Sequence, residues 1–309
     1  MKKIWKIVSA TALAAMLAAC GAEEETTKPA KESENSQYPL TVTDAIGNEV
    51  TIEEEPQRII SLAPSNTEIL YALGLEEQIV GLTTNDNYPP EVSEKPTVGD
   101  MEFNVEEIIN LNPDLVLVHE SGMFSAEALI DQLTALEIDV YVVDNAESFD
   151  ATYDTFEAIG ELTNREEEAA ELVEEVQTQI DEVVATVEGQ ESKSAFIVVG
   201  TDPDIYVVGQ KTFLHEMLEV LHVKNAVQEE GWPLYSAEDF VAANPDSIIF
   251  TYAGDDTNVL NNKAFSTMDA VKNNALTVVD GDTTSRQGPR IGDGLEEMAK
   301  AIYPDAFNN

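Results

Sequence analysis

The sequence NVEEIINLNPDLVL at residues 104–117 is followed, 132 positions later, by SAEDFVAANPDSII at residues 236–249. Both segments share one plan: a helix-capping residue, acids in the first turn, an apolar turn, the tripeptide Asn-Pro-Asp, and a short apolar run typical of a buried strand. The residue before a proline disfavours the helical conformation, so each helix is expected to end at Asn-Pro-Asp. A helix-then-strand unit that occurs twice predicts two similar α/β lobes.

Each copy also carries the residues of a capping box. Asn104 and Ser236 stand at the N-cap, and an acid follows three residues later, Glu107 in the first copy and Asp239 in the second. Acids in the first turn also suit the helix dipole. The two helices are therefore predicted to begin at residues 105 and 237.

Strand-like and helix-like segments alternate on both sides of the repeat. Before residue 150, apolar runs typical of buried strands lie at 58–63, 79–83, 115–119 and 140–143, with helical segments at 64–73, 105–111 and 126–136. After residue 189 the strands are expected at 195–199, 247–250 and 277–279, with helices at 212–221, 237–243 and 294–301. This alternation favours parallel sheets sandwiched by helices. Residues 40–52 alternate apolar and polar around Gly47-Asn48, which predicts an antiparallel hairpin.

A Glu-rich segment at residues 151–188 differs from both halves, because its apolar residues recur at helical spacing. Gly160, Thr163 and Asn164 are expected to divide it into two helical pieces. The predicted fold class is therefore α/β, with two Rossmann-like lobes and parallel-rich sheets joined by a long rigid α-helix. The lobes are assigned to residues 38–150 and 189–309.

The first residues have the layout of a secretory leader. Lys2, Lys3 and Lys6 precede an apolar run at residues 7–19, which is too short for a comfortable transmembrane span. Residues 1–19 are therefore predicted to be a signal peptide.

The leader ends at the only cysteine in the chain. The segment LAACG at residues 17–21 is similar to the lipobox of bacterial lipoproteins, in which Cys20 would receive diacylglycerol and become the mature N-terminus. Residues 20–37 are polar and read as a lipid-anchored flexible linker. The protein is thus expected outside the cytoplasm, anchored to the cell membrane through Cys20. The alternative is a plain signal peptide with a chance cysteine.

Charge excludes one large class of partners. The chain carries 60 Asp+Glu against 16 Lys+Arg, and loss of the three leader lysines would take the net charge from −44 to −47. Nucleic-acid binding needs clustered Lys and Arg, and no basic stripe is present. The single cysteine also excludes a disulfide framework and a four-thiolate metal site. The excess acid is expected to solvate an exported surface.

Catalytic and metal-binding motifs have little support. No Gly-x-Ser-x-Gly elbow is present, and the helix that begins near His215 lacks the second histidine of a zinc-protease motif. Asp280-Gly-Asp282 is a weak hint of calcium in so acidic a chain. We expect no catalytic residues, no metal site and no resident cofactor, and predict that the chain is not an enzyme. An enzyme or metal-ion chaperone on the same fold would need a convergent cluster of histidines and carboxylates.

Ligand capture is better supported. In two-lobed α/β proteins a small ligand fits the crevice at the carboxyl ends of the parallel strands. The candidate residues directly follow the predicted strands, or are scarce aromatic and basic residues in the second half: 65–68, 85–90, 119–123, Tyr206, Trp232 and Arg286.

From residue 38 to residue 307 the chain resembles the substrate-binding lipoproteins of ABC importers that carry cobalamin, iron-siderophores and haem, the class III substrate-binding proteins. The segments that carry this resemblance are RIISLAPSNTE at 58–68, NPDLV at 112–116 and GPRI at 288–291. Within the class, the likeness to cobalamin-binding proteins is greatest, through YPP at 88–90, GWPLYSAE at 231–238 and DTTSRQGPR at 282–290.

The resemblance implies roles for individual residues. Trp232 and Tyr206 would line the corrin face, and Asp282 and Arg286 would hydrogen-bond its peripheral amides. A broad disc with apolar faces and an amide rim suits aromatic walls and a few placed donors and acceptors. The alternatives are structural: Trp232 as a core or lobe-interface anchor, Tyr206 as a strand residue packed under the cleft, and Arg286 as a partner of neighbouring carboxylates.

Asn85, Tyr88 and His119 complete the set of candidate ligand residues. His119 could approach a cobalt or iron centre as an axial ligand, or could be a histidine of the cleft rim. The chain departs from the cobalamin-binding pattern at Asn85, Asp100 and His119, where such proteins often carry further aromatics. Arg290 is expected to fix local structure beside Pro289.

The resemblance also implies partners. In such proteins, glutamates placed like Glu106 and Glu238 dock onto arginines of the two membrane subunits of the permease, so one binding protein straddles a two-fold partner. The alternative is that these acids only favour the helix dipole. We expect a monomer that binds a small molecule and an ABC permease, reaches the membrane through its lipid, and binds no nucleic acid.

The main rival ligand is an iron-siderophore or haem. Siderophore pockets usually carry several Arg or Lys for an anionic chelate. This chain offers mainly Arg286, Arg290 and Lys211 in suitable places, so a corrinoid is the first choice.

Overall fold

The computed structural model describes residues 37–202 and 204–308, which form one compact unit beginning at Gln37. The predicted leader, Cys20 and all of the predicted linker except Gln37 lie outside the described residues. Within the described part of the chain, no helix is both long enough and apolar enough to span a bilayer.

The first lobe is built on a four-stranded parallel sheet. Its strands are β3 (Ile59–Ser61), β4 (Ile79–Gly81), β5 (Leu115–His119) and β6 (Asp139–Val143), in the order β4-β3-β5-β6. The helices between them are α1 (Pro64–Ala72), α2 (Val105–Asn110) and α3 (Met123–Thr134), together with the short 3-10 helices η1 (Pro90–Glu94) and η2 (Glu120–Gly122). The predicted hairpin is also present, as the antiparallel pair β1 (Leu40–Thr43) and β2 (Glu49–Ile52).

The second lobe holds a mixed sheet in the order β10-β8-β7-β11-β12, with β9 also paired to β7. Its strands are β7 (Ser194–Gly200), β8 (Ile205–Val207), β9 (Lys224–Asn225), β10 (Leu234–Tyr235), β11 (Ser247–Phe250) and β12 (Leu276–Val278). Strands β9, β7, β11 and β12 are parallel, and β8 and β10 form an antiparallel edge. The helices are α6 (Phe213–Val220), α7 (Ala237–Ala243), α8 (Asp255–Asn261), α9 (Asp269–Lys272), α10 (Gly281–Ser285) and α11 (Ile291–Ile302), with η3 (Lys263–Thr267) and η4 (Pro304–Phe307).

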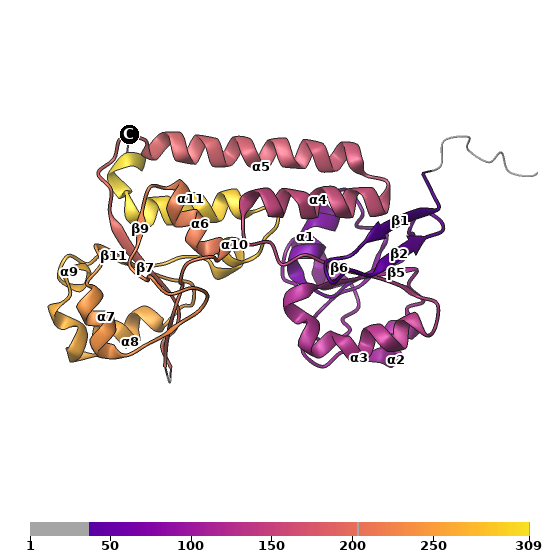
Figure 1. Ribbon diagram of the computed structural model, residues 1–309, viewed down its shortest axis with the longest axis horizontal. Helices are drawn as coiled ribbons and strands as arrows, with labels where there is room; N and C mark the ends of the chain where they lie inside the picture. The colour runs from indigo at the N-terminus through magenta and orange to yellow at the C-terminus, as the bar shows by residue number, and fades with distance from the viewer. Residues whose placement is uncertain (1–36, 203, 309) are drawn as a thin grey trace, which may run out of the picture. The chain divides into compact units, whose positions relative to one another are not determined.

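The Glu-rich segment forms two helices, α4 (Phe149–Thr163) and α5 (Glu166–Val187). The division falls at Asn164, which adopts a left-handed conformation with φ of 58°. After this turn α5 packs against α4 and then against α11, so the single helix α5 connects the lobes (Figure 1). Its 22 residues span about 33 Å at 1.5 Å per residue.

The repeat performs the same local task in both lobes. Asn112 and Asn244 both take positive φ, 49° and 39°, just beyond the helices that they end. In each copy, the aspartate of Asn-Pro-Asp accepts hydrogen bonds from the backbone at the start of a strand. Asp114 accepts hydrogen bonds from the backbone N–H of Arg58 at 2.9 and 3.0 Å, and Asp246 accepts one from that of Ser194 at 2.8 Å. Asn-Pro-Asp is therefore a helix stop followed by a strand anchor.

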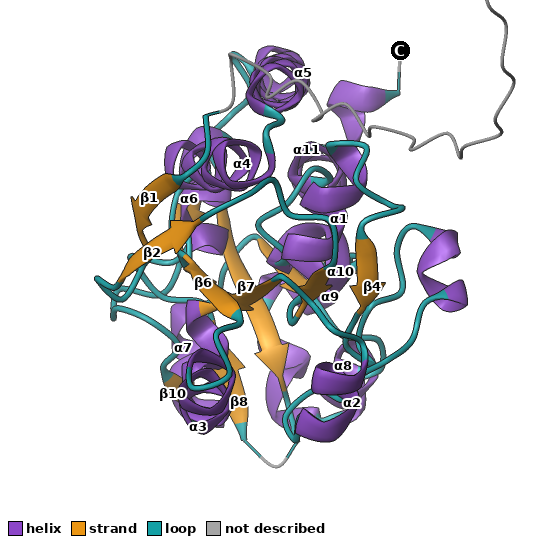
Figure 2. Ribbon diagram, turned by 90° about the vertical axis from the view of Figure 1, so that its right-hand side faces the viewer, coloured by secondary structure: helices purple, strands orange, loops and turns teal. Residues whose placement is uncertain are grey.

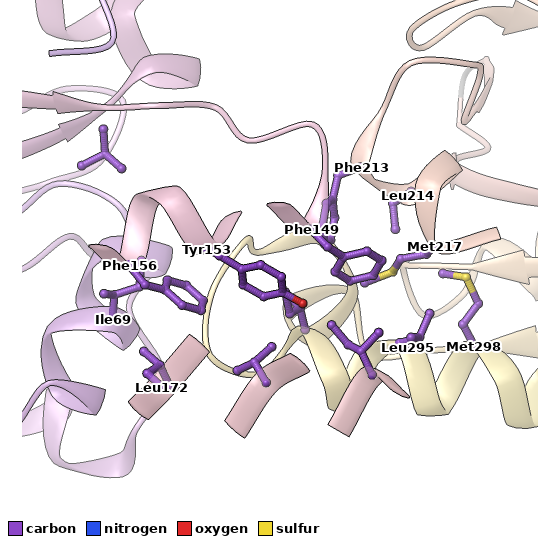
Figure 3. Close-up of a cluster of buried hydrophobic side chains, with 14 of the residues drawn as sticks. Ile69, Phe149, Tyr153, Phe156, Leu172, Phe213, Leu214, Met217, Leu295 and Met298 are labelled. Atoms are coloured by element: carbon purple, nitrogen blue, oxygen red, sulfur yellow. The ribbon is translucent and has the colours of Figure 1, made fainter. Parts of the chain in front are cut away.

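Helices lie on both sides of the two larger sheets (Figure 2). In β3, Ile59 and Ile60 point to different apolar clusters, as successive residues of a strand must. One of these clusters runs without interruption into the second lobe. Figure 3 shows its centre, where Phe149, Tyr153 and Phe156 of α4 lie between residues of both lobes. The edge-to-face contact of Phe149 with Phe213 of α6, at 5.2 Å, belongs to this cluster.

The structure confirms the predicted fold class: α/β, with two parallel-rich lobes joined by a long helix. The antiparallel edge of β8 and β10 was not expected from the sequence, because each strand has only two or three residues. The lobe limits 38–150 and 189–309 stay a prediction.

Candidate functional site

An exposed apolar face lies on the antiparallel edge of the second lobe. Leu234 of β10 pairs in register with Tyr206 of β8, and Trp232 precedes Leu234 by two residues. The ladder continues past the strand, since Val207 N donates to Pro233 O at 3.1 Å. Directly paired residues of an antiparallel ladder share a face, so Leu234 lies on the same side of the sheet as Tyr206, and Trp232 stands in the bend that leads into β10.

These three side chains are well exposed: Tyr206 43%, Trp232 53% and Leu234 56%. Their strand neighbours Val207 and Tyr235 instead pack in the apolar cluster beneath the sheet. Trp232 is therefore not a core anchor, and Tyr206 is not packed under the surface. Contiguous exposed apolar side chains mark binding surfaces more often than isolated ones do.

Two further exposed aromatics follow directly after parallel strands. Phe124, 76% exposed, lies in the first turn of α3 shortly after β5, and Tyr252, 62% exposed, is the second residue after β11. Both stand at carboxyl strand ends, where ligands of open α/β sheets bind. Sequence reasoning missed Phe124, Tyr252 and Leu234. Their position just after or within a short strand was the available signal, but exposure cannot be read from it.

Arg286 is the centre of a polar cluster that joins the two lobes. Its guanidinium donates to Glu68 Oε1 at 2.9 Å and to Asn87 Oδ1 at 2.8 Å, both in the first lobe. It also donates to the carbonyl of Asn85 at 3.4 Å and pairs with Asp282 Oδ1 at 2.9 Å. Asn87 Nδ2 in turn donates to Asp282 Oδ2 at 2.7 Å. Asn85, Asp282 and Arg286, predicted as ligand residues, are thus brought together, and Arg286 does pair with neighbouring carboxylates.

Arg290 completes this cluster from the start of α11. Its Nε and Nη2 donate to the two carboxylate oxygens of Glu68 at 2.8 and 2.6 Å, and its guanidinium lies 4.1 Å from the ring centre of Tyr88. The hydrogen bonds to Glu68 raise the pKa of Arg290 above its already high usual value. Arg290 therefore fixes structure, as expected, although the contact spans two lobes rather than a local turn.

Asp86 lies beside the cluster with an incomplete set of partners. Its Oδ2 accepts from Thr83 N at 2.8 Å and from Thr83 Oγ1 at 2.6 Å, while its buried Oδ1 has no hydrogen-bond partner. Burial raises the pKa of Asp86, and hydrogen bonds from Thr67 and Thr83, followed by the charge of Arg286, partly oppose that rise.

His119 is the last residue of β5. The residue is 8% exposed, and its Nδ1 is 2.8 Å from Ser121 Oγ. Burial lowers the pKa of His119, which favours the neutral imidazole, and Asp144 opposes this only in part. Among residues 37–202 and 204–308, no three His, Cys, Asp or Glu side chains are grouped so that they could hold a metal ion.

The two glutamates expected to dock onto a permease occupy matching places. Glu106 and Glu238 are exposed in the first turns of α2 and α7. The predicted caps are present: Asn104 Oδ1 accepts from Glu107 N, and Ser236 Oγ accepts from Asp239 N, each at 3.1 Å. The two lobes thus present the same acidic helix start.

Comparison with known proteins identifies the family. Residues 59–283 match the model described as periplasmic binding protein. The chain belongs to this family. The match covers most of both lobes, including α1, α4, α5 and the strands of both sheets.

Several relatives of this periplasmic binding protein carry functional names. An uncharacterized ABC transporter substrate-binding lipoprotein of Bacillus subtilis is 45% identical over 99% of both chains. A vitamin B12-binding protein of Pectobacterium carotovorum is 28% identical over 76% of this chain and 84% of its own. A solved structure from Staphylococcus epidermidis, described as a possible iron-binding (periplasmic solute-binding) protein, is 41% identical, with a TM-score of 0.76 over 81% of this chain and 100% of that one.

More distant structures share the fold alone. The haem-binding protein HutB of Vibrio cholerae is 21% identical, with a TM-score of 0.73 over 80% of this chain and 99% of that one. The family and its closer relatives show that this periplasmic binding protein is the substrate-binding component of an ABC transporter. Such a component takes a small-molecule ligand and works with permease subunits. The family consists of transport proteins rather than enzymes.

Proposed function

We propose that this protein is an extracytoplasmic lipoprotein that captures cobalamin, or a related corrinoid, between its lobes and delivers it to an ABC permease. The observation that carries the choice of ligand is the exposed apolar face of Tyr206, Trp232 and Leu234. The flat faces of a corrin are matched by such a surface, and its amide rim by neutral hydrogen-bonding groups. The vitamin B12-binding relative supports this choice.

The pairing of basic residues argues against an anionic iron chelate. Arg290 is occupied by Glu68, Arg286 is shared between Glu68 and Asp282, and Lys211 pairs with Glu230 at 2.6 Å. Each of the three cations that the sequence suggested for a siderophore or for haem propionates is therefore paired with a carboxylate. A neutral amide rim needs no such cation.

Haem remains the second candidate, since His119 stands at the carboxyl end of β5 and imidazole is a common iron ligand. Axial ligation would require the ring to move, because His119 is 8% exposed and its Nδ1 contacts Ser121. The relative described as a possible iron-binding protein supports including haem in the test below.

The remaining parts of the proposal concern anchoring and assembly. Cys20 carries the lipid, and the protein acts as a monomer without a resident cofactor. Glu106 and Glu238 dock onto arginines of the two permease subunits, one from each lobe. The lipoprotein of Bacillus subtilis, whose length this chain matches, supports the anchor.

Trp232 makes the ligand test specific. The chain has two tryptophans, Trp5 and Trp232, and Trp5 lies in the predicted leader. In protein that begins at Cys20, fluorescence therefore reports on Trp232 alone. We expect cyanocobalamin to quench it at about micromolar concentration or below, with a binding isotherm confirmed by calorimetry. No response to cyanocobalamin, with tight binding of haemin or of a ferric siderophore, would overturn the choice of ligand.

A further inference from the structure

Glu68 on α1 and Arg290 at the start of α11 form a bidentate contact between the lobes. Both carboxylate oxygens and two guanidinium nitrogens take part, at 2.8 and 2.6 Å. The side chain of Glu68 is 2% exposed and that of Arg290 is 16% exposed. Two parallel charge-assisted hydrogen bonds of this kind fix direction as well as distance.

The burial of Glu68 makes this contact sensitive to any change in spacing. An ionised carboxylate buried without partners is strongly unfavourable, and Glu68 is compensated by Arg290 and by Arg286. Both arginines lie in the second lobe, so separation of the lobes would remove both cations that compensate Glu68. In a chain with only 16 Lys+Arg, two of them meet on this one carboxylate.

The two arginines differ in what else holds them. Arg286 has three partners besides Glu68, namely Asn85, Asn87 and Asp282. Arg290 hydrogen-bonds Glu68 and lies over the ring of Tyr88, and both of these residues belong to the first lobe. Arg290 therefore links α11 directly to the first lobe.

Helix α11 transmits that position to the rest of the second lobe. Arg290 is its N-cap, and Ile291, Leu295 and Met298 are buried in the apolar cluster shared by the lobes. The hydrophobic effect is non-directional. The bidentate ion pair at the start of α11 is directional, so it constrains how the helix is oriented relative to the first lobe.

We propose that Glu68 and Arg290 are positioning residues that set the spacing of the two lobes, and with it the separation of the ligand-holding side chains on either side. This inference rests on the proposed capture of a ligand between the lobes. Neither residue contacts the ligand. Their effect is to hold the aromatic face of Tyr206 and Trp232 at a constant distance from the first lobe.

The test measures that distance directly. In the full-length chain with Cys20→Ser, which removes the only native cysteine, Thr134→Cys on α3 and Asn273→Cys after α9 provide exposed sites for spin labels. Pulsed EPR then gives the distribution of distances between the lobes. The variants Glu68→Gln and Arg290→Lys are compared with the parent, and stopped-flow mixing measures dissociation of cyanocobalamin.

We expect both variants to shift or broaden the distance distribution and to speed the dissociation of cyanocobalamin about tenfold, because geometry lost at an interface appears mainly in the off-rate. Asp114→Asn is the matched control. It makes the same carboxylate-to-amide change in a contact that lies within the first lobe, and it should leave the distance distribution unaltered.

Folded variants with the distance distribution and off-rate of the parent would overturn the proposal. Arg290→Lys keeps the charge on Glu68 compensated, so it decides the question if Glu68→Gln does not fold. If the parent fails to bind cyanocobalamin but the variants still broaden the distribution, the choice of ligand is wrong and the positioning role stands.

Discussion

At the scale of single residues, His119 makes the stability of the fold depend on pH. Burial holds the pKa of its imidazole below the ordinary value of 6.5 in the folded chain. The unfolded chain therefore binds this proton more tightly, so the contribution of His119 to stability is complete above pH 6.5 and is lost as the pH falls through 6.5 toward the folded pKa. Asp144 limits the shift but does not reverse it.

We predict that the free energy of unfolding decreases when the pH is lowered from about 7.5 to about 5.5. The decrease should be smaller in His119→Gln. Denaturant titrations at both pH values measure the two differences. The other histidines contribute equally to both proteins and cancel in the comparison. Equal losses in the parent and the variant would contradict the assignment.

Trp232 carries the ligand assignment at the same scale. Trp232→Ala is expected to weaken cyanocobalamin binding about 10-fold to 100-fold, since a large exposed aromatic that becomes covered by a ligand is a frequent hot spot. Calorimetry is the measurement, because the fluorescent reporter is removed. Leu260→Ala, at another 50% exposed apolar residue of the same lobe, is the control and should bind as the parent does.

At the scale of elements, the turn between α4 and α5 depends on close approach of the two helices. A Cβ at Gly160 would lie 2.6 Å from the Cβ of Ala169 and 3.0 Å from the carbonyl oxygen of Arg165. These atoms belong to the packed start of α5 and to its N-cap, so they cannot simply move aside. The residue that suggested a break in the helical pattern is thus needed for packing.

Gly160→Ala is predicted to lower the free energy of unfolding by about 1–3 kcal/mol through overpacking. Gly122→Ala, where a Cβ would meet nothing within 4 Å, should change it by less than about 0.5 kcal/mol. Chemical denaturation of both variants makes the comparison. Similar losses in the two would show that helix approach at Gly160 is not limiting.

At the scale of the whole molecule, the two lobes present Glu106 and Glu238 at equivalent helix starts. Two like charges at a constant separation suit a partner with two-fold symmetry. The long helix α5 and the Glu68–Arg290 contact both favour a constant separation. The docking proposal and the positioning proposal therefore require the same rigidity.

We expect Glu106→Arg combined with Glu238→Arg to abolish uptake in cells while ligand affinity stays as in the parent. Glu174→Arg combined with Glu182→Arg, on the exposed side of α5, makes the same change in net charge and should not affect uptake. Radiolabelled cyanocobalamin uptake and calorimetry on the purified variants separate transport from binding. Unchanged uptake would reject the docking assignment.

Local features of this protein could be predicted from its sequence, and the structure bears them out. The hairpin around Gly47, the caps at Asn104 and Ser236, the two Asn-Pro-Asp stops and the division at Asn164 all lie where expected. Each depends on backbone hydrogen bonds and dihedral preferences over a few neighbouring residues, and the local sequence determines both. The two-lobed α/β fold followed from repeating such units.

Only the tertiary structure decided how the candidate site is assembled. Glu68 and Arg290 are 222 residues apart, and nothing local to either predicts their pairing. Phe124 and Tyr252 are exposed and His119 is buried, although all three lie at or shortly after the carboxyl ends of strands. Burial and long-range pairing arise from the packing of whole elements, so the residues that give this protein its lobe spacing and its exposed aromatic surface become visible only when the chain is folded.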